Sequence, residues 1–212
     1  MLEKRARRLP LELRESADGK AGPLSGYAAV FYRDGDEGTQ YELWPARGTE
    51  PRAVERIDRY AFDEIMKKPT RDAAALFNHN PDLLLGREKS GTLRLSVDDQ
   101  GLRYEVDPDE DNPVWKQVRQ AVKRGDIDGS SFQFYVEEDE WTRNSDLEVR
   151  VIKRIARLID VGPVTFPAYQ ATSTEARDAL RPIRDKEASR IARELIERQA
   201  TLRRLQLARL AG

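Results

Sequence analysis

The sequence predicts a mainly β protein with a few helices (α+β), whose strands form a closed or nearly closed β-barrel, followed by a C-terminal amphipathic helix. Short runs of alternating apolar and polar residues fill the first two thirds of the 212-residue chain. Such runs are typical of half-buried strands. Helical features are confined to two stretches of this region, whereas residues 184–210 contain neither Gly nor Pro.

The predicted strands follow one another closely along the chain. Turn residues from Asp98 to Gly101 separate two alternating runs and predict a hairpin between them. The last run is long enough for one or two strands. In order, strands are expected at residues 9–13, 26–32, 93–97, 102–106, 132–136 and 149–161.

Two helices are expected among these strands. Residues 53–67 predict a short helix that stops before Pro69. Residues 112–124 carry clearer signals, because Asn112 is a good N-cap and Gly125 follows the end. The buried face of this second helix would consist of Val114, Val118 and Val122.

The last third of the chain has a different character. Residues 171–184 form a polar stretch with Pro182 near its end, which suggests a connector, and residues 184–210 suggest a helix. The helix could pack on the same chain or on a partner helix. A nucleic-acid-binding arm is less favoured, because acidic residues are interspersed with the basic ones.

The counts of reactive residue types exclude several kinds of site. The chain has no cysteine, which removes disulfides, Cys-ligated metals and cysteine nucleophiles. It has one histidine, which removes sites that need two imidazoles from one chain. A glycine-rich phosphate loop is also missing, so we expect neither a cofactor nor a metal.

Charge and hydropathy limit the partners. Lys and Arg total 37 against 38 Asp and Glu, so a net charge of −1 gives no global reason to bind nucleic acid. The apolar runs are far shorter than the ~18 residues of a membrane span. The basic N-terminus lacks the apolar core of a secretory signal. We therefore expect an intracellular, soluble protein that binds neither nucleic acid nor membranes.

His79 is the candidate general base, as the single imidazole of the chain. An apolar run leads into it and Pro81 follows, which predicts a position at a strand end or in a loop. A lone histidine in such a position is also commonly a surface or structural residue. Both interpretations stay open on sequence alone.

Ser131 is the candidate nucleophile, because Gly129 and Ser130 precede it just before an alternating strand. Its hydroxyl needs a base, and His79 is the available imidazole. With Gln133 at the next glycine position and a strand following, this is not the elbow of α/β-hydrolases. A plain turn would explain the same segment.

Asp160 lies in a strongly apolar stretch, residues 156–167. Burying a carboxylate there is costly unless it is paired or hydrogen-bonded. Asp160 therefore either faces solvent or an arginine at a strand end, or holds the base imidazole in the correct tautomer.

A series of segments carries a family likeness through its order and spacing: residues 26–31, 55–57, 61–62, 76–81, 85–87, 91–95, 101–102, 126–134 and 161–169. Together they resemble the prohead (capsid maturation) serine protease family of tailed bacteriophages, which is distantly similar to the herpesvirus assembly proteases. The likeness covers residues 8–175.

The resemblance implies a barrel similar to that of the herpesvirus proteases, with Ser131 as nucleophile, His79 as base and Asp160 as orienting acid. The family's usual motif is close to Gly-x-Ser-x-Gly-Phe, and Gln133 stands here in place of its second Gly. The herpesvirus enzymes use a second histidine as third member, which this chain does not have.

The resemblance also implies a function. The chain would be a serine endopeptidase that cleaves the scaffold, the scaffold segment of the major capsid protein, and itself. It would act inside the assembling prohead in the host cytoplasm. Residues 1–175 would form the protease domain. Residues 176–212 would form a connector and helix for targeting, for self-association or for removal by self-cleavage.

Three alternatives stay open. The chain could be an inactive structural homologue that acts as a capsid scaffold or assembly factor. It could be a nucleic-acid-binding barrel, although Phe132 and Phe134 lie beside an acidic run. Finally, Ser131 could be activated by a lysine, Lys116 or Lys123, which would need burial to act as a base.

Overall fold

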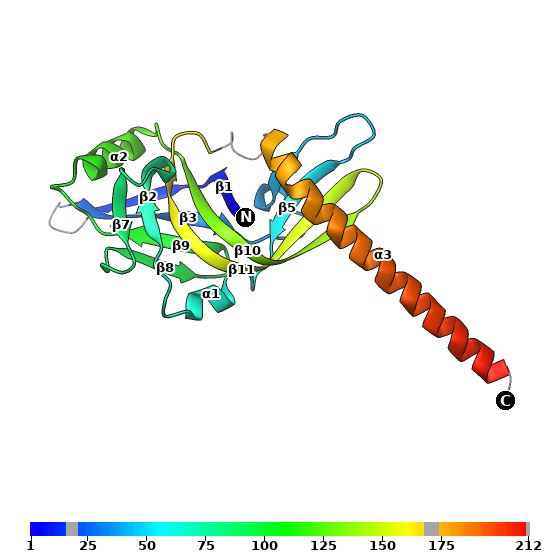
Figure 1. Cartoon of the computed structure of the whole chain (residues 1–212). Helices are drawn as coiled ribbons and strands as arrows, with labels where there is room; N and C mark the ends of the chain where they lie inside the picture. The colour runs from blue at the N-terminus through cyan, green and yellow to red at the C-terminus, as the bar shows by residue number, and fades with distance from the viewer. Residues whose placement is uncertain (16–20, 168–173, 211–212) are drawn as a thin grey trace. The chain divides into compact units, whose positions relative to one another are not determined.

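Two β-sheets build the first of the two units into which the chain divides, Met1–Thr172 and Ser173–Gly212. The computed structural model (Figure 1) describes residues 1–15, 21–167 and 174–210. The larger sheet contains, in spatial order, β1 (Leu2–Arg8), β10 (Gly129–Arg143), β11 (Leu147–Val164), β5 (Arg52–Ile57) and β4 (Tyr41–Trp44); β6 (Ala74–Leu76) pairs with β11, and β7 (Leu84–Arg87) with β6. The smaller sheet contains β2 (Leu11–Glu15), β3 (Ala21–Val30), β9 (Gly101–Val106) and β8 (Leu93–Val97).

These elements confirm a mainly β fold with a few helices. The helical segments of the first unit are short: η1 (Glu37–Thr39), α1 (Asp63–Lys67), η2 (Phe77–His79) and α2 (Pro113–Arg124). Across residues 1–15 and 21–167, strand pairing produces two separate sheets and no single closed one. Closure into a barrel therefore stays a prediction.

The expected strands are present, with shifted ends. The runs at 93–97 and 102–106 form the antiparallel hairpin β8–β9, in which Leu93 lies opposite Val106. The run at 149–161 is a single strand, β11. The first expected strand begins at Leu11, and Leu9 is buried just before it.

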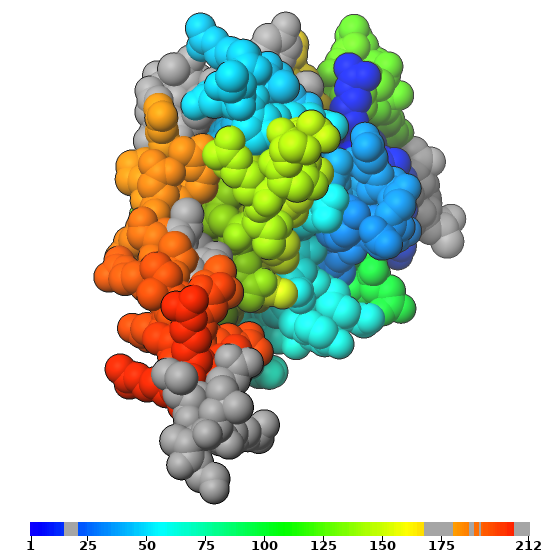
Figure 2. All heavy atoms as spheres, turned by 90° about the vertical axis from the view of Figure 1, so that its right-hand side faces the viewer, coloured from blue at the N-terminus to red at the C-terminus, as the bar shows by residue number. Residues whose placement is uncertain are grey.

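The hairpin of β10 and β11 extends through the whole first unit. The two strands are 15 and 18 residues long. Register shifts interrupt their pairing between Gln133 and Asp139, and such bulges bend a strand. One edge of β11 pairs with β5 from Leu147 to Ile152. In Figure 2 the far end of the hairpin lies beside the segment that contains β4 and β5.

The apolar core lies between the two sheets. Phe132 and Phe134 on β10 stack with their ring centroids 4.5 Å apart, and Phe62 packs on Phe132. Other core side chains come from the smaller sheet (Leu24, Ala28, Leu102, Tyr104) and from β11 (Ile152, Ile155, Leu158, Val161). Aromatic packing thus fixes the start of β10, where the candidate nucleophile lies.

The helix expected at residues 53–67 is wrong over most of its length. Residues 52–57 are strand β5, which lies between β11 and β4, and only residues 63–67 are helical. Val54 and Ile57 are completely or almost completely buried in this central strand. Their β-branched side chains favour a strand, and tertiary burial outweighed the helix-compatible pattern.

Helix α2 agrees closely with the sequence pattern. The Asn112 side chain accepts hydrogen bonds from the N–H groups of Val114 and Trp115, and Gly125 ends the helix in the left-handed conformation at φ 78°. Val118 is buried, with Val114 and Val122 partly buried beside the core. Trp115, also buried, completes the inner face.

The second unit is the helix α3 (Thr174–Leu210). The connector expected at 171–184 is wrong from Thr174 onward, because α3 continues through Pro182; residues 171–173 lie outside the described residues. Pro182 removes one backbone donor, but the alanine, leucine, arginine and lysine residues around it favour a helix.

Over the whole length of α3 the sequence does not place its apolar residues on one face, so the amphipathic pattern predicted for residues 184–210 does not extend through the complete helix. The adjacent residues Leu195 and Ile196 are both exposed, although neighbouring residues point about 100° apart on a helix. Leu202 and Leu205 are exposed as well. Among the described residues, none of the helices is long and apolar enough to cross a membrane.

Strand β1 was not expected, because its sequence is dominated by charges. It pairs antiparallel with β10, and Ala6 lies opposite Ser131. Two of its charged residues, Glu3 and Arg5, are buried. Their partners come from distant strands, so alternation of apolar residues could not reveal this strand.

Glu3 and Arg5 form a buried cluster of four charged residues together with Glu55 and Arg150. Arg5 donates to Glu55 through Nε and Nη2 at 2.7 Å each, and to Glu3 at 2.8 Å. Arg150 donates to Glu3 at 2.5 and 2.9 Å and to Glu55 at 2.9 Å. Each arginine thus joins both glutamates, and the cluster connects β1, β5 and β11.

In the pKa values of Glu3 and Arg5, the effect of charge pairing outweighs the opposite effect of burial. Burial alone would raise the pKa of Glu3, but the hydrogen bond from Arg150 and the charges of both arginines hold that pKa below its usual value. Burial alone would lower the pKa of Arg5, but the charges of Glu55 and Glu3 raise it. Glu3 and Arg5 are therefore charged together near neutral pH.

Replacement of Arg150 by Met should lower the free energy of unfolding by about 3–5 kcal/mol, because Glu3 and Glu55 would remain buried with one cation too few. Urea denaturation followed by circular dichroism measures this loss. Arg154→Met is the matched control, since Arg154 lies on the same strand as Arg150 and pairs with Glu138, but is 42 % exposed. A loss in Arg150→Met no larger than in this control would contradict a structural role for the cluster.

Glu3→Gln should weaken the pH dependence of stability. The lowered pKa means that the unfolded chain binds the Glu3 proton more tightly than the folded chain, so acid favours unfolding. The contribution of Glu3 is complete above the usual carboxyl pKa of about 4.3. It disappears as the pH falls through the lower folded-state pKa.

Urea denaturation between pH 7 and pH 3 tests this dependence. The difference in unfolding free energy between the native chain and Glu3→Gln should shrink as the pH falls. Glu64→Gln is the control, because Glu64 is exposed and its pair with Lys67 is screened by salt. A constant difference across the whole range would contradict the prediction.

Candidate active site

The turn that carries His79 follows a short strand on the edge of β11. Strand β6 pairs in parallel with β11, with Ala74 opposite Asp160 and Ala75 opposite Val161. The close approach depends on Gly162, where a Cβ would lie 2.2 Å from the carbonyl oxygen of Leu76. His79 comes three residues after Leu76, in η2, at the strand end that its sequence context predicts.

Ser131 lies near the start of β10, between two paired strands. It is opposite Ala6 of β1 on one side and Gly162 of β11 on the other. The residue is completely buried. Its position in a paired strand excludes the plain turn that the sequence left open.

Asp160 lies on β11, two residues before Gly162, and is 1 % exposed. Gln133 of β10 lies opposite it on one side, and Ala74 of β6 on the other. A carboxylate at this depth needs a partner. The solvent-facing interpretation of Asp160 is therefore excluded by its burial.

The three candidate residues form one chain of contacts. His79 Nε2 lies 2.5 Å from Ser131 Oγ, and His79 Nδ1 lies 2.5 Å from Asp160 Oδ1. The His79 side chain is only 6 % exposed. Since a carboxylate only accepts, Nδ1–H donates to Asp160, which leaves Nε2 of a neutral ring free to accept a proton from Ser131. This arrangement can transfer a proton away from the serine hydroxyl.

A second acceptor competes for the Ser131 proton. The main-chain oxygen of Arg5 lies 2.7 Å from Ser131 Oγ and accepts a hydrogen bond from it. The hydroxyl has one proton, so it can be donated to Arg5 or to His79 but not to both. Sequence reasoning missed Arg5, and no residue type could have revealed a role that belongs to a main-chain carbonyl.

The other oxygen of Asp160 has no partner among the described residues. Asp160 Oδ2 is buried without a hydrogen bond, whereas Oδ1 contacts His79. Buried polar atoms of this kind are uncommon in folded proteins and often occur at functional sites. The carboxylate is therefore directed at the imidazole through one oxygen only.

The neighbouring Ser130 points to a different partner. Its hydroxyl lies 2.9 Å from the Tyr104 hydroxyl, and both residues are fully buried. Burial raises the pKa of Tyr104, while the hydrogen bond with Ser130 lowers it by a smaller amount. Tyr104 therefore stays protonated and ties β10 to β9, away from the imidazole.

The exposure of two lysines and the burial of two aromatic rings remove the residues on which two alternatives from the sequence rest. Lys116 and Lys123 are exposed on α2, so burial does not prepare either of them to act as a base. Phe132 and Phe134 are fully buried in the core, so they cannot stack on nucleic-acid bases. Gln133 is not among the residues with positive φ, so the position does not require glycine.

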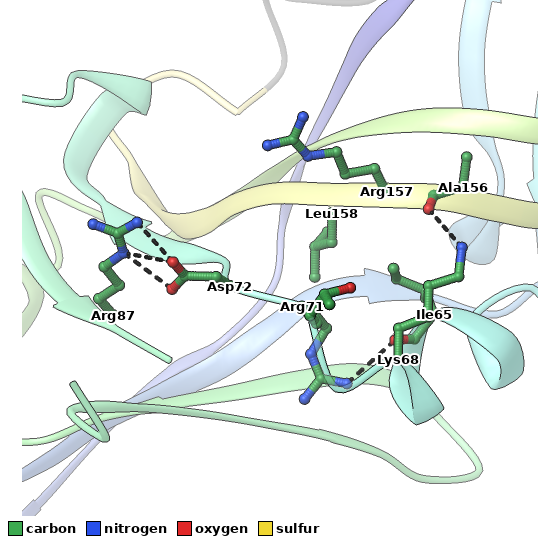
Figure 3. A pocket seen from close by; sticks show the side chains of 9 residues that line it. Ile65, Lys68, Arg71, Asp72, Arg87, Ala156, Arg157 and Leu158 are labelled. Atoms are coloured by element: carbon green, nitrogen blue, oxygen red, sulfur yellow. Dashed lines mark hydrogen bonds and ion pairs between the residues drawn. The ribbon is translucent and has the colours of Figure 1, made fainter. Parts of the chain in front are cut away.

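A separate pocket of about 450 Å³ lies beside β11 (Figure 3). Arg87 pairs with Asp72 at 2.7 Å at one end, and Lys68 donates to the Ala156 carbonyl at 3.1 Å at the other. Ser131, His79 and Asp160 are not among its lining residues. The pocket is therefore distinct from the Ser–His–Asp contacts.

The fold and this site define a mainly β protein in which a buried serine, histidine and aspartate are in contact. Residues 9–185 match the family described as caudovirus prohead serine protease, and the chain belongs to this family of peptidases. It is 28 % identical over 182 residues to the "Prohead protease" of Enterobacteria phage HK97, an alignment that covers 83 % of this chain and 70 % of that protein. Comparison with solved structures found no match.

Proposed function

We propose that the chain is a serine endopeptidase of prohead maturation, in which Ser131 is the nucleophile, His79 the general base and Asp160 the group that orients the imidazole. The observation that carries this proposal is the continuous contact from Ser131 Oγ through both ring nitrogens to Asp160 Oδ1. Family membership supports the peptidase class. With one histidine in the chain, the third member is an acid.

In the proposed reaction, His79 first accepts the proton of Ser131 and then donates it to the leaving amine. Ser131 Oγ attacks the peptide carbonyl carbon while its proton passes to His79 Nε2. Asp160 stabilises the imidazolium, which then protonates the leaving amine as the C–N bond breaks. Water then attacks the acyl carbon while His79 takes its proton. The bond between the acyl carbon and Ser131 Oγ breaks, and His79 returns the proton to Oγ as the acid product leaves.

The resting geometry supports a site that opens to receive substrate. Ser131 exposes no surface, so a peptide carbonyl reaches Oγ only after a neighbouring segment moves. In the same step the hydroxyl proton would turn from the Arg5 carbonyl toward His79 Nε2. The nucleophile is thus held in an unreactive hydrogen bond until substrate binds.

The substrates of this proposal are phage capsid proteins. We expect the scaffold protein, or the scaffold segment of the major capsid protein, and the protease itself to be cleaved inside the assembling prohead, in the host cytoplasm. The name of the HK97 relative, "Prohead protease", supports this assignment. Residues 1–175 would be the protease domain, with the herpesvirus-like barrel that the resemblance implies.

Ser131→Ala and His79→Ala should each abolish processing of the major capsid protein of the same phage on co-expression, measured by mass spectrometry. Asp160→Asn should lower the rate by about 10²–10⁴-fold, because the imidazole loses its orienting charge. An inactive scaffold homologue predicts no processing even by the native chain.

Ser130→Ala is the matched control for this experiment. Ser130 is the adjacent buried serine, but its hydroxyl contacts Tyr104 rather than an imidazole. Processing should therefore continue in Ser130→Ala. Processing that survives both Ser131→Ala and His79→Ala would show that the active site lies elsewhere.

The helix α3 has a role of its own in this proposal. Its exposed apolar residues suit a partner helix, either on the capsid lattice or on a second copy of the chain, and they include Leu195, Ile196, Leu202 and Leu205. A chain that ends at Thr174 should therefore cleave peptides normally but fail to be packaged into proheads. Prohead purification and immunoblotting measure packaging. Normal packaging of the shortened chain would refute a targeting role.

A further inference from the structure

The turn that carries the candidate base has an unusual backbone. Asn78 and His79 have φ of 56° and 58°, and they are the residues other than glycine with positive φ in the described part of the chain. The left-handed conformation costs energy for any residue with a Cβ, and two in succession need contacts that hold them. Asparagine tolerates this conformation better than most residues.

Asn78 supplies such contacts through both ends of its amide. Its Oδ1 accepts a hydrogen bond from the Thr165 N–H at 2.9 Å, and its Nδ2 donates to Thr165 Oγ1 at 3.1 Å. Thr165 directly follows Val164, the last residue of β11. The amide therefore ties the His79 turn to the strand that carries Asp160.

The imidazole needs this support because it must meet two partners at once. Ser131 Oγ and Asp160 Oδ1 each lie 2.5 Å from opposite ends of the ring. A small rotation of the turn would lengthen at least one of these contacts. The hydrogen bonds within the turn, such as that from Asn80 N–H to the Phe77 carbonyl, do not connect it to β11.

We propose that Asn78 is a positioning residue for the His79 base. The proposal rests on the proposed serine mechanism. The imidazole contacts Asp160 and Ser131, and the hydrogen bonds of the Asn78 amide to Thr165 add a third contact that holds the His79 turn. Asn78 is exposed, so its bonds contribute little to global stability. Their effect falls on the rate of the step in which Ser131 loses its proton, rather than on substrate binding.

The full-length chain, treated with a fluorophosphonate, tests the proposal. An activated serine Oγ attacks the phosphorus and displaces fluoride, which leaves the serine phosphonylated. The limiting rate of labelling should fall about 10- to 100-fold in Asn78→Gly, which keeps the left-handed backbone but loses the amide. The concentration of probe for half-maximal rate should stay within about twofold of native, since the amide acts on the base alone.

Two further variants separate positioning from folding. Asn78→Asp keeps the acceptor for Thr165 N–H and can accept from the Thr165 hydroxyl, so its labelling rate should recover to within about threefold of native. Thr165→Val removes only the Oγ1 acceptor and should lower the rate severalfold. If Asn78→Gly does not fold, a native rate in Thr165→Val overturns the proposal.

Asn144→Gly is the matched control. Asn144 also accepts two backbone N–H bonds, from Asp146 and Leu147, but in the loop between β10 and β11. Its labelling rate should equal that of the native chain. A fall in Asn144→Gly as large as in Asn78→Gly would overturn the proposal, because loss of any such turn contact would then have the same effect.

A nuclear magnetic resonance measurement reads the geometry without any activity. The chain has one histidine, so the ring ¹⁵N signals belong to His79 without assignment. They should show Nδ1–H as the dominant tautomer in the native chain and a mixture of tautomers in Asn78→Gly. Unchanged ring signals together with a native labelling rate would overturn the role of Asn78.

The same measurements distinguish this proposal from the one on which it rests. If Ser131→Ala is labelled as fast as the native chain, the serine assignment is wrong, and the ring signals of Asn78→Gly alone decide whether Asn78 orients His79. If Ser131→Ala is not labelled and Asn78→Gly reacts at the native rate, the mechanism stands and the role of Asn78 is refuted.

Discussion

The backbone pairing of β11 with β10 and with β6 decides where the three candidate side chains meet. Pairing with β10 puts Ser131 opposite Gly162, and pairing with β6 puts Ala74 opposite Asp160. A shift of one residue in either register would turn a side chain to the other face of the sheet. The absence of a side chain at Gly162 lets β6 approach, and that approach sets the origin of the His79 turn. The contacts among the three side chains are thus a consequence of strand registers.

The buried charge cluster connects stability with this site through β1. Arg5 uses its side chain to bind Glu55 and Glu3, while its carbonyl accepts from Ser131. The charges fix β1 across the sheet, and β1 in turn fixes the competing acceptor beside Ser131, the proposed nucleophile. A buried ion-pair network is costly compared with an apolar core, so its retention suggests a specificity role. Here that role would be to hold one main-chain oxygen at a defined position.

The alternation of apolar and polar residues and the helix-capping residues predicted the parts of the fold that depend on local sequence. The hairpin at residues 93–106 and the caps of α2 follow directly from alternation, Asn112 and Gly125. Strand β1 could not be predicted, because the partners of its charged residues come together only after folding. Arg5 pairs with Glu55, 50 residues away in the sequence, and Glu3 pairs with Arg150, 147 residues away. The helix prediction for residues 53–67 failed for the opposite reason. Because β5 is buried on both faces, its sequence lacks the alternation of apolar and polar residues that identifies a half-buried strand. The candidate site came from family resemblance, whereas its contacts required the tertiary fold.

If Ser131 is the nucleophile, as proposed, the closed state of the site would have a consequence for a protease that is assembled together with its substrate. Ser131 is completely buried and its hydroxyl is hydrogen-bonded to Arg5, so two separate changes precede attack: access must open and the proton must turn to His79. Each change lowers the fraction of molecules that can react with a passing protein. Binding energy from a substrate held at high local concentration, as inside a closed shell, can offset both changes. With Ser131 as the proposed nucleophile, its burial and the competing acceptor would therefore favour cleavage after confinement over cleavage in free solution.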